Sequence, residues 1–178
     1  MQILRDPLGN DDSPPGAVIS IGSFDGVHIG HQAVLTHVVE RARSMGAAAV
    51  AMTFDPHPVK LLRPGVAPRL LTTLDQRLDL IARTGIETAL VVPFTHRLAR
   101  MGAADFVRDV LVDRLAVREV YIGDNFRFGA DRSGDVGLLR SMGAELGFRA
   151  AAAPIVEAEG GVVSSTRVRQ AVEEGHVE

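Results

Sequence analysis

The stretch that decides the fold reads GSFDGVHIGH, at residues 22–31. It follows the apolar run AVISI at 17–21 and precedes residues 34–45, where apolar side chains recur at helical spacing. This pattern predicts a strand, a glycine-rich turn and a helix. Gly22 and Gly30 let the backbone approach a ligand closely, and the N–H groups that open a helix favour an anion. The turn therefore predicts a phosphate site, to which His28 and His31 can donate hydrogen bonds.

The two histidines also have less specific explanations. One of them could cap the helix, or both could bind a metal ion, although a zinc site usually needs three or four ligands. Two other phosphate signatures are missing: no lysine follows a second glycine as in a Walker A loop, and the glycine spacing differs from G-x-G-x-x-G. These differences argue against a P-loop kinase and against a dehydrogenase.

Strand-like and helix-like segments alternate along the rest of the chain. Apolar runs predict four more strands, at 47–54, 88–92, 117–122 and 148–156. Helices are predicted at 73–83, 103–115 and 136–146, and from Ser164 or Ser165 to 174. We expect an α/β fold, a doubly wound and mostly parallel five-stranded sheet with helices on both faces. Ligands of such sheets bind beyond the carboxyl ends of the strands.

The proline-rich segment at 55–70, DPHPVKLLRPGVAPRL, interrupts this alternation. Proline lacks a backbone N–H and has a fixed φ angle, so we expect no regular structure there. Pro56 and Pro58 should instead stiffen the loop that follows the second predicted strand.

The composition is that of an ordinary globular protein. The chain of 178 residues is 46% apolar and 23% charged, which suits one domain. Its net charge of −3 gives no reason to expect nucleic acid or an anionic membrane as a partner. It has no cysteine and no run of roughly 20 apolar residues, and its first residues, MQILRDPLGNDD, lack the basic and apolar regions typical of a signal sequence. We therefore expect a cytoplasmic protein without nucleic-acid or membrane partners.

Four motifs occur in the order and spacing of one enzyme family. They are IGSFDGVHIGH at 21–31, TFDPHP at 53–58, IGDNFRFGADRSGD at 122–135 and VSSTRVRQAVEEG at 163–175. From residue 17 to its end the chain resembles the adenylyltransferase module of prokaryotic bifunctional FAD synthetases, which are HxGH-type nucleotidyltransferases. The resemblance implies a Rossmann-like nucleotidyltransferase fold. It also implies transfer of AMP from ATP to FMN, giving FAD and pyrophosphate in the presence of Mg²⁺.

The same resemblance implies roles for individual residues. Catalytic roles fall to His28, His31, Asn125 and Arg169, with the two histidines on the α- and β-phosphates. The residues implied in ATP binding are Gly22, Ser23, Phe24, Gly30, Ser164, Ser165 and Thr166. Asn125 could contact phosphate or Mg²⁺ through its amide oxygen, and the sequence does not specify the metal ligands. We expect Asp25 to orient the turn by accepting backbone N–H bonds rather than to touch substrate.

The last motif predicts a second anion site. Its serines and threonine open a helix, where hydroxyls and unpaired N–H groups can bind phosphate, although an ordinary helix cap has the same pattern. Arg167 and Arg169 lie two residues apart and point to different faces, so we expect only one to reach the nucleotide. The resemblance selects Arg169, for the β- or γ-phosphate.

Aromatic residues gather in the loops predicted after the strands. Five of the seven phenylalanines fall there: Phe24, Phe54, Phe94, Phe126 and Phe128. Aromatic side chains at the ligand-binding edge suit a flat ring system, although each ring could equally plug the end of the sheet. The predicted flavin-binding residues are Phe54, Pro56, His57, Pro58, Phe126 and Phe128.

The sequence stops at Glu178, without the riboflavin kinase domain that ordinarily follows in the family. We therefore expect residues 1–178 to form one adenylyltransferase domain with ATP and FMN as its small-molecule partners, and predict no kinase activity. Two other functions stay open. The chain could be an HxGH nucleotidyltransferase with another phosphorylated acceptor, or a module that binds flavin or nucleotide without turnover.

Overall fold

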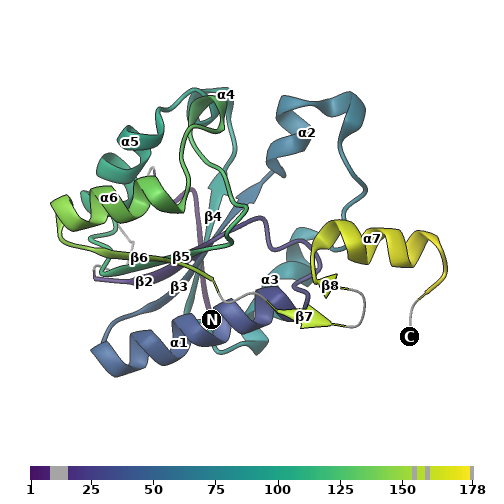
Figure 1. Cartoon of the computed structure of the whole chain (residues 1–178), viewed down its shortest axis with the longest axis horizontal. Coiled ribbons are helices and arrows are strands. Elements are labelled where there is room, and N and C mark those ends of the chain that lie inside the picture. The colour runs from purple at the N-terminus through teal and green to yellow at the C-terminus, as the bar shows by residue number, and fades with distance from the viewer. Residues whose placement is uncertain (9–15, 154–155, 159–160, 177–178) are drawn as a thin grey trace.

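The computed structural model describes residues 1–8, 16–153, 156–158 and 161–176 (Figure 1). The strands are β1 Gln2–Arg5, β2 Val18–Ile21, β3 Ala49–Asp55, β4 Thr88–Pro93, β5 Glu119–Ile122, β6 Arg149–Ala152, β7 Glu157–Ala158 and β8 Gly161–Val162. The α-helices are α1 Ile29–Met45, α2 Pro58–Leu62, α3 Leu74–Arg83, α4 His96–Ala99, α5 Ala103–Asp105, α6 Val136–Leu146 and α7 Ser165–Glu173. Two 3₁₀ turns, η1 Pro64–Val66 and η3 Ala130–Arg132, and a π-helical stretch, η2 Phe106–Val112, complete the helical segments of this part of the chain.

The main sheet has six strands in the order β1-β4-β3-β2-β5-β6, and every neighbouring pair is parallel. The parallel α/β fold with helices on both faces is therefore confirmed. A separate antiparallel pair joins β7 to β8. The strand order reverses at β2, which pairs with β3 on one side and with β5 on the other. A ligand site is expected beyond the carboxyl end of β2.

The predicted count of five strands is wrong, because β1 adds a sixth. This strand lies at the edge of the sheet and pairs only with β4. Three of its four residues are exposed, so it has no continuous apolar run of the kind that marks a buried strand. The segment predicted as a strand at 148–156 contains β6, and residues 154–155 within it lie outside the described part of the structure.

Helices cover both faces of the sheet because its side chains alternate between two core clusters. In β2, Ile19 and Ile21 join one cluster and Val18 joins the other. The first cluster includes residues of η2 and α6, and the second includes residues of α1 and α3, which lie on opposite sides of the sheet in Figure 1. The helix predicted at 103–115 is present as α5 followed by η2.

The proline-rich segment contains regular structure, contrary to our expectation. His57 caps α2, accepting a hydrogen bond at Nδ1 from the Val59 N–H (3.3 Å). Pro58 occupies the first turn, where the N–H that proline lacks would be unpaired in any residue. The prolines here start a short helix instead of preventing one.

None of the helices in the described ranges is long and apolar enough to cross a membrane. The longest, α1, has 17 residues, whereas a span takes roughly 20 apolar ones.

Candidate active site

The turn between β2 and α1 is held in shape by buried side chains. Phe24, Gly26 and Val27 all have positive φ angles, of 48°, 79° and 37°. Such angles are costly for residues other than glycine, but the side chains of Phe24 and Val27 are buried in the core. At Gly26 a side chain would be strained, because φ is 79° and a Cβ would lie 2.7 Å from Leu71 Cδ1. Since the Phe24 ring is buried, a nucleotide at this turn would meet its backbone rather than its ring.

His28 and His31 lie against each other at the start of α1. His28 is the N-cap, and its Nδ1 accepts a hydrogen bond from the His31 N–H (3.3 Å). The two rings stack with centroids 3.6 Å apart and planes 20° apart, and Phe24 packs edge-on against His31. A Cβ at Gly30 would lie 3.2 Å from His28 Nδ1, so a side chain there would press on the ring. Because Nδ1 of His28 accepts, its neutral ring carries the proton on Nε2 and can donate from it.

Burial favours the neutral form of both imidazoles. Burial lowers the pKa of His28, and the charge of Asp25 only partly opposes it. Burial also lowers the pKa of His31 to about 3, helped by His28 and Arg77 and opposed by Asp25. The Nδ1 atom of His31 is buried without a hydrogen-bond partner in the described structure. A bound anion would raise both pKa values, because a nearby negative charge favours the protonated form.

Asp25 joins the turn to two other segments. Its fully buried carboxylate accepts hydrogen bonds from the Leu71 N–H (3.0 Å) and from the N–H (3.1 Å) and hydroxyl (3.3 Å) of Thr72. It also forms an ion pair with Arg169 Nη2 (3.3 Å). Burial alone would raise the pKa of Asp25, but these hydrogen bonds outweigh it and lower the pKa. Asp25 accepts backbone N–H bonds as expected, although from residues 71–72 rather than from its own turn.

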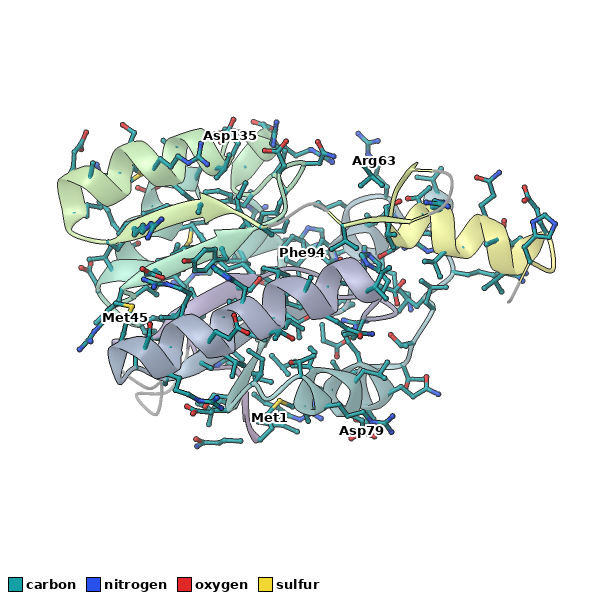
Figure 2. All side chains as sticks on the ribbon, turned by 60° about the horizontal axis from the view of Figure 1, so that its bottom comes forward. Met1, Met45, Arg63, Asp79, Phe94 and Asp135 are labelled. Carbon is teal, nitrogen blue, oxygen red and sulfur yellow. The ribbon has the colours of Figure 1, made fainter. Side chains whose placement is uncertain are left out.

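The start of α7 lies beside the same turn, so the first and last motifs meet. Ser164 caps α7, accepting at Oγ from the Arg167 N–H (3.3 Å), and the Ser165 hydroxyl donates to the Asp25 carbonyl (3.0 Å). Thr166 is exposed. In Figure 2, Met45 at the C-terminal end of α1 lies at the opposite end of the molecule from α7. The histidine end of α1 is therefore the end next to α7.

The two arginines of α7 contact different neighbours. Arg169 donates from Nε to the Arg69 carbonyl (3.0 Å) as well as pairing with Asp25. Arg167 donates from Nη1 to the Gly161 carbonyl in β8 (2.7 Å). Arg169 thus belongs to the cluster around the turn, while this contact of Arg167 is directed toward the β7–β8 pair.

The aromatic residues divide into buried and partly exposed rings. Phe54 is in β3 and is only 7% exposed, and its ring packs edge-on against Phe94 (5.7 Å between centroids). Phe126 and Phe128, after β5, stack at 6.3 Å. Phe94, Phe126 and Phe128 are partly buried against the same core cluster that contains Phe54. They remain accessible at the carboxyl edge of the sheet, whereas Phe24 and Phe54 mainly fill the core.

Asn125 and His57 lie on two other segments of the chain. Asn125, in the loop after β5, is exposed, and His57 is partly buried as the cap of α2. Burial is the largest cause that lowers the pKa of His57. The segment after α2 includes Arg63, which Figure 2 shows on the same side of the molecule as α7. Within the described residues no group of three His, Cys, Asp or Glu side chains could hold a metal ion, so the two histidines have no third ligand there.

Sequence reasoning missed Arg77, a buried residue behind the turn. It is 2% exposed, and its Nη1 lies 3.4 Å from Thr53 Oγ1 and 3.5 Å from the Phe54 carbonyl. Thr53 in turn donates to the Ser23 carbonyl (3.2 Å). One signal was available: Arg77 lies three residues after Leu74 and four before Ile81, so it falls on the apolar face of α3.

Comparison with known proteins places this arrangement in context. A family model described as FAD synthetase matches residues 10–167. The bifunctional riboflavin kinase/FMN adenylyltransferase of Escherichia coli (strain K12) is 41% identical over 174 residues, which cover 97% of this chain and 55% of that protein. A Geobacillus thermodenitrificans protein, whose name is the same but provisional, is 43% identical over 168 residues, covering 92% of this chain and 87% of that protein. The chain spans about half the length of the Escherichia coli relative.

A solved structure has the same fold over nearly the whole chain. The crystal structure of a macrolide-efflux protein from Streptococcus pneumoniae superposes with a TM-score of 0.82 at 25% sequence identity. The match covers 99% of this chain and 58% of that one. This similarity supports the arrangement of strands and helices described above.

Proposed function

Because the chain belongs to the FAD synthetase family, we propose that it transfers AMP from ATP to the phosphate of FMN, giving FAD and pyrophosphate. The observation that carries this proposal is the stacked His28–His31 pair at the start of α1, next to the start of α7. Two helix N-termini at one place suit a ligand with several phosphates. The relatives named as FMN adenylyltransferases support FMN as the acceptor.

The reaction needs positioning and charge stabilisation rather than a new nucleophile. An FMN phosphate oxygen attacks the α-phosphorus of ATP, the bond from that phosphorus to the bridging oxygen of pyrophosphate breaks, and pyrophosphate leaves in line. The FMN phosphate is already ionised at neutral pH, with a second pKa of about 6, so no general base is required. The task of the protein is to align the two phosphates and stabilise the charge that builds on the leaving group.

The start of α1 is suited to the α- and β-phosphates. We assign the Nε2–H of His28, the ring of His31 and the opening N–H groups of α1 to these phosphates, with Gly22, Ser23 and Gly30 allowing a close approach. Burial favours the neutral form of both histidines before ATP binds, and phosphate charge then favours protonation of His31, while His28 keeps Nδ1 as the acceptor of the His31 N–H. Positive charge would therefore increase at this place only when the nucleotide is bound.

The start of α7 is assigned to the outer phosphates. Thr166 is exposed there, and the N–H groups at the start of the helix favour an anion, as do the hydroxyls of Ser164 and Ser165. Arg169 has five N–H donors, so it can keep its bond to Asp25 and also donate to a β- or γ-phosphate. The ion pair between Asp25 and Arg169 would keep this second anion site next to the first one, at the start of α1.

The flavin is assigned to the aromatic edge of the sheet. Phe126 and Phe128 form a stacked, partly exposed pair that can supply one apolar wall. The segment from Phe54 to Pro58, with Pro56 and His57, would form the other wall, where the ring of Phe54 acts mainly from the core. An apolar enclosure of this kind suits isoalloxazine and gives a small phosphorylated acceptor little to contact.

Mg²⁺ is proposed to arrive with the phosphates of ATP. This ion keeps several waters and takes only one or two protein oxygens in nucleotide sites, so a cage of carboxylates is not required. The exposed amide oxygen of Asn125 suits such a contact. When bound, Mg²⁺ would neutralise part of the phosphate charge.

An acceptor comparison tests this function. The protein is incubated with ATP, Mg²⁺ and one acceptor at a time: FMN, riboflavin, pantetheine phosphate or nicotinate mononucleotide. We expect FAD from FMN, and no product from riboflavin because it lacks the attacking phosphate. Pyrophosphate release with another acceptor but not with FMN would favour a sibling nucleotidyltransferase. Flavin binding without any pyrophosphate would favour a binding module.

We assign only adenylyl transfer to residues 1–178. Both relatives carry the name of a riboflavin kinase as well, and the Escherichia coli protein is nearly twice as long as the segment it shares with this chain. A kinase that makes FMN is therefore the partner that we propose for this module.

A further inference from the structure

Arg77 is buried without an ion pair, which is an unusual position for a permanent charge. Only 2% of the residue is exposed, and none of the ion pairs between described residues includes it. Its contacts with Thr53 Oγ1 and the Phe54 carbonyl are long, at 3.4 Å and 3.5 Å, and its Nε has no hydrogen-bond partner. Arginine does not lose its proton in proteins, so the charge stays. Such burial is costly unless something compensates it.

The contacts of Arg77 lead from the segment after β3 to the turn that carries the proposed phosphate site. Thr53 accepts from Arg77 and donates to the Ser23 carbonyl (3.2 Å), so Arg77 contacts the turn through one hydroxyl. The charge of Arg77 is felt by both His31 and His57, whose pKa values it lowers in addition to the effect of burial. Asp25 and Asp55 favour the charged form of Arg77, but burial outweighs them and lowers its pKa. Asp25 already pairs with Arg169, and neither carboxylate forms an ion pair with Arg77 among the described residues, so the arginine stays under-compensated.

A bound polyphosphate would supply the missing compensation. An anion at His28 and His31 would lie on the other side of the turn that Arg77 supports, in a setting where water screens little. We infer that Arg77 is a buried positioning residue of this site: it fixes the Ser23 backbone through Thr53 and stabilises the phosphates of ATP by its charge. This inference rests on the proposed function. Stability would be sacrificed for binding, as is common at functional sites.

The test compares matched variants in ATP binding and in thermal stability. Arg77→Met removes the charge at similar length, and Arg77→Lys keeps it. Arg41→Met is the control, because Arg41 on α1 pairs with the buried Glu119 (2.6 Å), away from the turn. Dissociation constants for ATP and AMP are measured by calorimetry, and Tm by circular dichroism.

Arg77→Met should weaken ATP binding about tenfold or more, and AMP binding less, because the electrostatic loss grows with ligand charge. Its Tm should stay equal to or above that of the wild type, since an apolar residue replaces an uncompensated buried charge. Arg77→Lys should recover most of the ATP affinity. Arg41→Met should lower the Tm, because Glu119 loses its partner. It should leave the ATP affinity unchanged.

Three results would overturn the inference. The first is an Arg77→Met protein with lowered Tm, or too unstable to purify, as a merely structural arginine would give. The second is an unchanged dissociation constant for ATP, and the third is a Lys variant as impaired as the Met variant. If the wild-type protein binds ATP but forms no FAD, the proposed function fails while the comparison of Arg77 variants still stands.

Discussion

Single residues decide how this site responds to phosphate, and the two histidines are the most direct example. His28 donates from Nε2 because its Nδ1 is occupied by the His31 N–H. Replacing His28 or His31 by Ala should lower kcat for FAD formation about 10²–10³-fold, the usual cost of removing one donor that stabilises developing charge. FMN binding, measured by fluorescence quenching, should change little, since the flavin is assigned to other residues.

His37→Ala is a matched control for that experiment. His37 lies on the same helix but packs edge-on against Tyr121, away from the turn. It should leave kcat near the wild-type value. If His28→Ala and His31→Ala are as active as His37→Ala, the phosphate roles of the histidines are wrong.

The depressed histidine pKa values also make stability depend on pH. Between its ordinary value of 6.5 and about 3, His31 is protonated when unfolded and neutral when folded. The unfolded state then binds more protons, so the free energy of unfolding falls as the pH drops through this range, by up to about 1.4 kcal/mol per pH unit for one group. His28 acts in the same direction. The lowered pKa of Asp25 adds to the loss only below its ordinary value of 3.8.

Urea unfolding between about pH 7 and pH 5 measures this slope, because histidine is the side chain that ordinarily titrates there. His31→Gln, which is neutral throughout, should reduce the slope relative to the wild type. An equal slope in the two proteins would show that His31 is not held neutral by burial.

At the scale of elements, one carboxylate connects three segments that are far apart in the sequence. Asp25 binds the N–H groups at 71–72 and the guanidinium of Arg169, while its backbone carbonyl accepts from Ser165. Asp25→Asn should lower the free energy of unfolding by about 1.5–3 kcal/mol, because hydrogen bonds to a charged group are lost in a buried place. The dissociation constant for ATP should rise as well, since α7 would no longer be held beside α1.

Asp79→Asn on α3 is the matched control. Asp79 is exposed, and a surface change of this kind is usually worth less than about 0.5 kcal/mol. Urea unfolding and ATP binding are measured for both variants. Equal stability of Asp25→Asn and Asp79→Asn would mean that the carboxylate does not connect these segments.

Local chemistry made several elements predictable. The apolar runs of β2 to β5 are buried at nearly every position, so their parallel pairing follows from their composition. Thr73 caps α3 with a complete capping box, and Ser164 caps α7. β1 and α2 were missed for opposite reasons: β1 has little buried surface to mark it, and α2 begins with the proline that usually ends a helix.

At the scale of the whole molecule, the site depends on contacts that no local pattern contains. The motifs at 21–31 and 163–175 could be recognised as two anion sites, but the Asp25–Arg169 ion pair spans 144 residues. Burial also divided the five phenylalanines, leaving Phe94, Phe126 and Phe128 partly exposed while Phe24 and Phe54 fill the core. Arg77 was missed because the feature that singles it out is a buried charge without an ion-pair partner among the described residues. Only the folded structure shows this feature.

The central claim is that the α-phosphate of ATP becomes part of FAD at this site. The most direct measurement uses ATP labelled at its α-phosphorus, mixed with FMN, Mg²⁺ and excess protein, with flavins and pyrophosphate separated after one turnover. We predict that the label enters the flavin fraction as FAD, in an amount equal to the pyrophosphate released. Pyrophosphate release with the label left in AMP, or FMN recovered unchanged with ATP intact, would contradict the claim.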